Sequence, residues 1–81
     1  MKIHSIWEAN TTLDKYTIVF EPELNRHGEK YYQFLGMSEG GIAVSQFGEL
    51  KKPPNRYLGK KIKFEDLSEA TRSHILGRIE E

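Results

Sequence analysis

The run from Tyr16 to Phe20 (YTIVF) constrains the fold of this chain most strongly. Its residues are β-branched or aromatic, a composition typical of pleated strands, and the run has too little polarity for a side that faces solvent. A second run, Lys30 to Met37 (KYYQFLGM), also predicts a strand, and Gly36 within it predicts a bulge or a close backbone approach. We therefore expect a sheet that contains both runs.

The N-terminal segment predicts a further strand. Alternation in Lys2–Trp7 is typical of an edge or first strand, with Ile3 on the same face as Trp7. The polar stretch Glu8–Lys15 predicts a turn that leads into Tyr16.

The chain after Met37 predicts two more strands. The glycines within residues 38–41 predict a hairpin turn. The returning strand is expected at Ile42–Gln46, with Gly48 breaking it, and the last strand at Tyr57–Phe64. The apolar residues of that last strand share one parity, and so one face: Leu58, Ile62 and Phe64.

The C-terminal segment predicts a helix. Ser68 is a favourable N-cap, and Glu69 follows it where the helix dipole stabilises a negative charge. The helix is expected to run to about Ile79. Its apolar stripe has a spacing of four residues and is widened by one neighbour; the stripe is Thr71, Ile75 and Ile79, with Leu76 beside it.

Strands followed by a single helix favour an α+β fold. We expect one domain over residues 1–81, with a small twisted antiparallel sheet of about five strands or a partly closed barrel, and the helix from Ser68 to about Ile79. The residues expected in the core are Tyr16, Ile18, Phe20, Phe34, Leu35, Leu58, Ile62, Phe64, Leu67, Ile75 and Ile79.

Composition narrows the setting and the chemistry. The sequence contains no cysteine, so disulfides and thiolate metal sites are excluded. The N-terminus is a poor match to a signal peptide, and no apolar run approaches membrane-spanning length, so we expect a cytoplasmic protein that does not act in a membrane. We expect no cofactor.

One catalytic motif occurs by pattern alone. Gly36–Gly40 (GMSEG) matches the nucleophile elbow G-x-S-x-G, which would make Ser38 the nucleophile of a small hydrolase. That motif needs a strand-to-helix turn, whereas a glycine-rich turn and another strand are expected here. The three histidines, His4, His27 and His74, have no metal-ligand spacing, so we predict neither a catalytic nor a metal-binding residue.

The segment Lys51–Leu67 carries the strongest charge asymmetry, because it has no acidic residue before Glu65. Its basic side chains could meet phosphates, with an aromatic ring available to stack on a base. The alternative is a solvated strand face whose charges protect a sheet edge, and the balance of twelve basic and twelve acidic residues favours it. The predicted nucleic-acid or partner-binding residues are Lys51, Lys52, Arg56, Tyr57, Lys60, Lys61 and Lys63.

Four segments of the chain are Lys15–Phe20 (KYTIVF), Tyr32–Ser38 (YQFLGMS), Ser45–Glu49 (SQFGE) and Leu58–Leu67 (LGKKIKFEDL). In this order they resemble a group of short, uncharacterised proteins of bacterial genomes, plasmids and phages. Members of the group run YTVVF, LGMSE, a GxSQ-type turn and LGKRI, and Ser68 stands where their pattern has proline. The resemblance implies a bacterial or mobile-element setting and no catalytic or binding residue.

The expected function is therefore a small non-enzymatic binding domain that acts on a protein or nucleoprotein partner. A weak nucleic-acid binder that uses the basic residues of 51–63 is the alternative. A homodimer formed by pairing sheet edges is also open.

Overall fold

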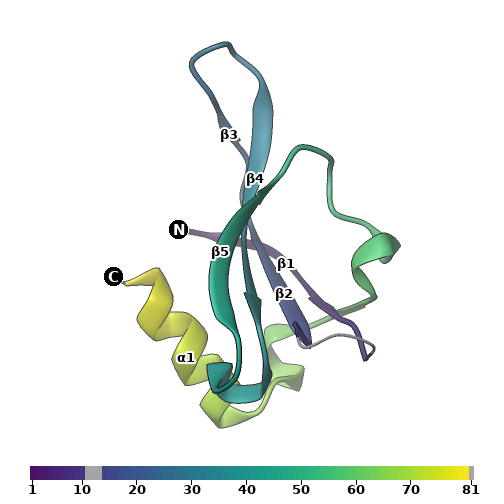
Figure 1. Ribbon diagram of the computed structural model, residues 1–81, viewed down its shortest axis with the longest axis vertical. Coiled ribbons are helices and arrows are strands. Elements are labelled where there is room, and N and C mark those ends of the chain that lie inside the picture. The colour runs from purple at the N-terminus through teal and green to yellow at the C-terminus, as the bar shows by residue number, and fades with distance from the viewer. Residues whose placement is uncertain (11–13, 81) are drawn as a thin grey trace.

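The computed structural model describes residues 1–10 and 14–80 (Figure 1). These residues form an α+β fold, an open six-stranded antiparallel sheet with one C-terminal helix. The elements are β1 (Ile3–Glu8), β2 (Tyr16–Phe20), β3 (Glu23–Leu24), β4 (Lys30–Met37), the 3₁₀ helix η1 (Glu39–Gly41), β5 (Ser45–Leu50), η2 (Arg56–Leu58), β6 (Lys60–Ile62), η3 (Phe64–Asp66) and α1 (Glu69–Ile79). The turn predicted over Glu8–Lys15 includes residues 11–13, which lie outside the described residues.

Four strands of the sheet, β1, β2, β4 and β5, form an antiparallel meander, and the last strand, β6, joins the sheet at its first strand. β1 pairs with β2, β2 with β4, and β4 with β5, all antiparallel, and β6 then pairs with the other edge of β1. β3 continues the line of β2 along β4, so these strands form a long hairpin that projects beyond the rest of the molecule (Figure 1). β5 and β6 are the outer strands of the main sheet, and among the described residues the two-residue β3 has a free edge of its own on the projecting hairpin. Of the two predicted forms the structure shows the open sheet.

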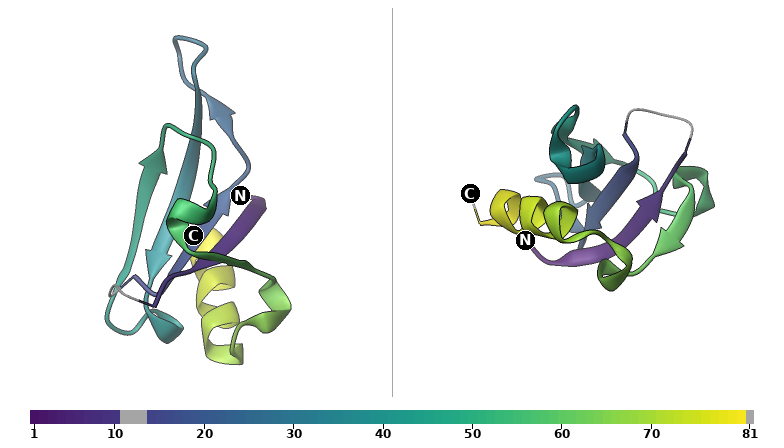
Figure 2. Two further views of the ribbon diagram at one scale, coloured as in Figure 1. Left: turned by 90° about the vertical axis from the view of Figure 1, so that its right-hand side faces the viewer. Right: turned by 90° about the horizontal axis from the view of Figure 1, so that it is seen from below.

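One face of the sheet is covered by α1 (Figure 2). Ile75 of the helix is fully buried against Ile18 and Leu35 of the central strands. Burying each side chain of this size stabilises the fold by about 1.5–3 kcal/mol. The first core cluster consists of Ile6, Tyr16, Ile18, Phe20, Leu35, Met37, Leu67 and Ile75, with Ile3, Ile62, Phe64 and Ile79 packed at its margin.

The opposite face of the sheet is covered by the segment that follows β5. Leu58 from this segment packs against a second cluster formed by Trp7, Val19 and Tyr32. The indole N–H of Trp7 donates to Ser5 Oγ at 2.8 Å, which satisfies the one polar group that the ring buries. The central strand β2 is therefore buried on both faces, as the YTIVF run predicts.

Every residue predicted for the core contributes to one of these two clusters. The prediction missed five buried hydrophobic residues, which are Ile6, Trp7, Val19, Tyr32 and Met37.

The predicted helix is confirmed. Ser68 Oγ accepts the backbone N–H of Thr71 at 3.2 Å, and α1 ends at Ile79. The stripe that faces the sheet consists of Thr71, Ile75 and Ile79. Leu76 is 48% exposed, so its predicted place in the stripe is wrong.

Two predicted face assignments are wrong because the backbone is irregular at those points. The register of β1 shifts between Ile3 and Ser5, and this bulge turns Ile3 to the α1 side while Trp7 lies on the other. The last predicted strand shortens to β6, because Gly59 adopts a φ of +117° that interrupts it. Leu58 before this glycine consequently joins the opposite cluster from Ile62.

The returning strand β5 begins and ends later than predicted, and Gly48 lies inside it. Ile42, which the sequence pattern places in this strand, is 91% exposed. A Cβ atom at Gly48 would lie 2.6 Å from Cζ of Phe34, so the ring occupies the space that a side chain would need. Gly48 is therefore a packing residue rather than a strand breaker.

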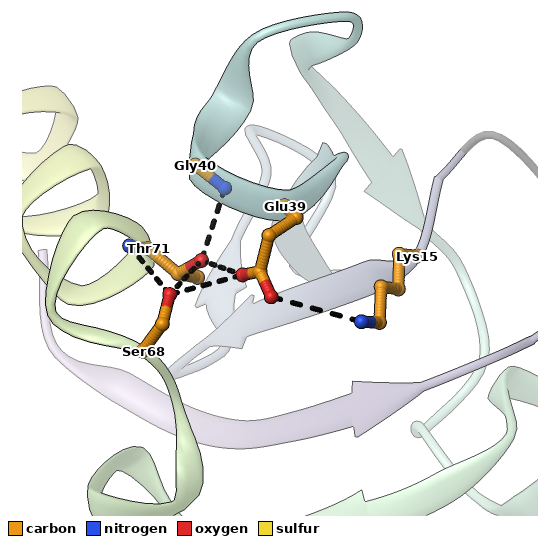
Figure 3. Close-up of polar contacts among 5 residues, drawn as sticks. All are labelled: Lys15, Glu39, Gly40, Ser68 and Thr71. Atoms are coloured by element: carbon orange, nitrogen blue, oxygen red, sulfur yellow. Dashed lines mark hydrogen bonds and ion pairs between the residues drawn. The ribbon is translucent and has the colours of Figure 1, made fainter.

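A polar network joins α1 to the turn between β4 and β5 (Figure 3). The carboxylate of Glu39 accepts a hydrogen bond from Thr71 Oγ1, lies 3.1 Å from Ser68 Oγ and lies 3.7 Å from Lys15 Nζ. Thr71 Oγ1 in turn accepts the backbone N–H of Gly40 at 3.0 Å. The hydrogen bond from Thr71, helped by Ser68 and Lys15 and opposed by burial, holds the pKa of Glu39 below its ordinary value of 4.5.

Substitutions at two glycines should have opposite effects on stability. Gly48→Ala should lower the free energy of unfolding by about 1–3 kcal/mol, because its methyl group displaces the Phe34 ring. Gly77→Ala should raise it by about 0.5–1 kcal/mol, because this helical position has open space around it. Urea unfolding followed by circular dichroism measures both, and a neutral Gly48→Ala would contradict the packing described for Phe34.

Glu39→Gln should change how stability depends on pH. Because the folded state lowers the pKa of Glu39, the unfolded chain binds more protons and the carboxylate stabilises the fold above pH 4.5. This contribution should disappear as the pH falls through the lowered pKa. Unfolding of wild type and Glu39→Gln across this range should show curves that converge at acidic pH. In a Thr71→Val background the difference above pH 4.5 should shrink, and an unchanged difference would exclude Thr71 as the main cause.

Candidate functional site

Two hollows lie at the end of β5, near the projecting β3–β4 hairpin. The Tyr57 hollow has a volume of about 300 Å³ and is lined by Glu49, Leu50, Lys51, Lys52 and Tyr57. The Tyr31 hollow has a volume of about 310 Å³ and is lined by Asn25, Glu29, Lys30, Tyr31, Glu49 and Lys51. Glu49 and Lys51 border both hollows, so the end of β5 separates them.

Local capping places the aromatic wall of the Tyr57 hollow. Asn55 precedes η2 and its Oδ1 accepts the backbone N–H of Tyr57 at 2.9 Å, as an N-cap does. Leu58 anchors the other side of this turn in the second core cluster. Tyr57 remains 53% exposed, and it lines the hollow together with Lys51 and Lys52, so an aromatic ring and two basic residues border it.

The wall of the Tyr31 hollow belongs to the β3–β4 hairpin. Asn25 Oδ1 accepts the backbone N–H groups of His27 and Glu29 at 2.8 and 3.0 Å, and this shapes the turn. The hydroxyl of Tyr31 donates to Glu23 Oε2 at 3.0 Å. This hydrogen bond is the main reason that the pKa of Tyr31 lies above its ordinary value.

The edge of β5 that borders these hollows has no strand beside it among the described residues (Figure 2). Facing residues in an antiparallel ladder alternate between pairs that exchange hydrogen bonds and pairs that do not. Ser38 N–H donates to the carbonyl oxygen of Val44 at 2.9 Å, and the register continues unbroken along β5. The backbone N–H and C=O groups of Ser45, Phe47 and Glu49 therefore point away from β4.

Side chains of α1 contact β5 on the face of the sheet that the helix covers. His74 Nε2 lies 2.7 Å from Ser45 Oγ, and Arg78 Nη1 donates to the same hydroxyl at 3.3 Å. The guanidinium of Arg78 also lies 4.7 Å from the centre of the Phe47 ring, a cation–π geometry. Sequence reasoning missed this cluster, because the helix and the strand are distant along the chain and carry no motif.

The structure brings only some of the predicted binding residues together. Lys51, Lys52 and Tyr57 meet at the Tyr57 hollow. The rest lie along the segment that runs from β5 around the side of the sheet (Figure 1). Arg56 is exposed in η2, and Lys60 and Lys61 are successive residues of β6 whose side chains point to opposite faces. Lys63 precedes η3, and its backbone N–H donates to Asp66 Oδ2 at 3.0 Å.

The geometry gives the hydrolase motif no support. Ser38 Oγ accepts the backbone N–H groups of Ala43 and Val44 at 2.9 and 3.1 Å, as expected of a hydroxyl that stabilises a turn. The described residues contain two hydroxyl–imidazole pairs, Ser45 with His74 and Ser5 with His4, and neither pair borders either hollow.

Three negative findings concern larger features. In residues 1–10 and 14–80, no three histidine, aspartate or glutamate side chains gather in a way that could hold a metal ion. In the same residues, no helix has the length and apolar character needed to cross a membrane. Comparison with protein-family models, with curated proteins and with solved structures finds no match.

Proposed function

We propose that this chain is a non-enzymatic binding domain that recruits a protein partner by adding an extended segment of that partner to the free edge of β5. The single observation that supports it is the position of this edge, which is unpaired in the described structure and lies between two hollows. A cytoplasmic setting in a bacterium or mobile element belongs to the same proposal, and it rests on the sequence features described above and on the resemblance alone.

The two outer strands differ in a way that favours β5 as the docking edge. β6 is only three residues long and carries Lys60 and Lys61, two features that discourage pairing with another strand. β5 is six residues long and contains neither lysine nor proline. A partner strand would therefore meet an unprotected row of donors and acceptors at β5.

The side chains beside this edge could provide specificity. Main-chain hydrogen bonds supply affinity in strand addition, and side-chain pockets select the sequence. Phe47 on one face of β5 is 41% exposed, and Tyr57 beside the other face is 53% exposed. Partly exposed aromatic rings of this kind are common anchors in protein interfaces.

Glu49→Pro should weaken strand addition at β5 by at least about tenfold, because proline removes an outward N–H and obstructs the edge. Glu49→Ala is the matched control, since it removes the same carboxylate and keeps the N–H. The probe is a displayed library of random dodecapeptides selected against wild type. Selected peptides are then synthesised and titrated against the three proteins by fluorescence anisotropy.

Several outcomes would overturn the proposal. Equal binding to Glu49→Pro and Glu49→Ala would show that peptides dock elsewhere, and a selection that yields no binder would deny the function itself. Sedimentation that shows a wild-type dimer and a Glu49→Pro monomer would assign the edge to a second copy of this chain. Circular dichroism and thermal unfolding verify that both variants fold.

Nucleic-acid binding is the second candidate, because Lys51 and Lys52 meet Tyr57 at one hollow. Ammonium groups beside an exposed aromatic ring can bind phosphates and stack on a base. The carboxylate of Glu49 at the same hollow, and that of Glu29 at the neighbouring Tyr31 hollow, oppose the binding of a polyanion.

If the second candidate is correct, duplex and single-stranded DNA should bind at low salt and dissociate steeply as salt increases. Each phosphate that Lys51→Glu/Lys52→Glu no longer neutralises should make the negative slope of log K against log salt less steep by about 0.9 on duplex DNA. Titration by fluorescence anisotropy measures this slope. Absence of binding at low salt would exclude nucleic acid as the partner.

A further inference from the structure

We infer that the partner segment carries an acidic side chain beside Leu50, where it enters the Tyr57 hollow between Lys51 and Lys52. This inference rests on the proposed function and names the chemistry of the segment that β5 would accept.

The strand geometry decides where a side chain of the partner would point. Side chains directly opposite each other on paired strands lie on the same face of the sheet. Leu50 packs on the second core cluster and lines the Tyr57 hollow. A partner residue beside Leu50 therefore faces this hollow, whether the added strand is parallel or antiparallel.

The charges of the two hollows differ, and only one favours an anion. The residues that line the Tyr57 hollow include two lysines, Lys51 and Lys52, and one acidic residue, Glu49. The Tyr31 hollow is balanced by charge and contains Lys30 and Lys51 with Glu29 and Glu49.

A carboxylate suits the Tyr57 hollow better than a chain of phosphates does. Lys51 and Lys52 line this hollow together with Leu50 and Tyr57, so a carboxylate there would have two basic side chains and an apolar wall around it. Glu49 lines the same hollow and repels either ligand, but an extended polyanion would bring several negative charges past it, whereas the partner side chain brings one. Both lysines are exposed, so the attraction should weaken as salt increases.

The other face of β5 suggests the rest of the probe. Phe47 lies three positions before Leu50 and, by strand alternation, on the opposite face, where Arg78 covers part of its ring. An apolar partner residue beside Phe47 would extend this contact. A segment with one acidic and one apolar residue, three positions apart, therefore matches both faces of the edge.

The test uses three acetylated, fluorescein-labelled heptapeptides of alternating threonine and valine. They differ only in the residue that lies beside Leu50, which is glutamate, glutamine or lysine, and a reversed set covers the other strand direction. Each peptide is titrated by fluorescence anisotropy at low salt. The proteins are wild type, Lys51→Glu/Lys52→Glu, and Lys60→Glu/Lys61→Glu, which makes the same charge change on β6.

Wild type should bind the glutamate peptide about five- to tenfold more tightly than the glutamine peptide, and the lysine peptide most weakly. Lys51→Glu/Lys52→Glu should reverse this order, and Lys60→Glu/Lys61→Glu should preserve it. Equal binding of all three peptides to wild type would overturn the acidic preference and leave strand addition intact. Binding of none would overturn both proposals. Displacement of the glutamate peptide by oligothymidylate at matched charge would assign the hollow to nucleic acid instead.

Discussion

The fold depends on the burial of β2 from both sides. Ile18 and Val19 are adjacent residues with no exposed surface, yet they face opposite layers of the molecule. One layer is the amphipathic helix α1, and the other is the irregular segment that carries Leu58. An antiparallel sheet in a chain this short would ordinarily leave one face exposed to water. Here the segment that carries Leu58 covers that face and buries apolar surface that the helix alone could not bury.

The path of the segment that covers the second face determines what the two outer edges of the sheet are like. The chain leaves β5, crosses the second face through η2 and returns to β1 as β6, which Gly59 and η3 restrict to three residues. The edge at β6 is therefore short and basic. The edge at β5 stays long and free of lysine, and the crossing segment places Tyr57 beside its end. The candidate docking surface at β5 is therefore a consequence of the path that the chain takes to cover the second core cluster.

The contacts between α1 and β5 hold the free edge of β5 in one conformation. Ser45 is held by His74 and Arg78, and the turn before β5 is tied to the start of α1 through Glu39 and Thr71. An edge that is already ordered loses less conformational entropy when a partner strand pairs with it. The pair of Ser45 with His74 therefore links the helix to the strand.

The sequence by itself determined the strong strands, the helix with its Ser68 cap and most of the core, because period-two and period-four apolar patterns are local properties. Only the tertiary structure decided the bulge that reverses Ile3, the Phe34 ring that requires Gly48, and the division of Leu58 from Ile62. Each depends on atoms that are distant in the chain. The same distinction between sequence and tertiary structure applies to the candidate site. Its lysines and Tyr57 were visible as a basic segment, whereas the free edge beside them arises from strand order, which residue patterns do not encode.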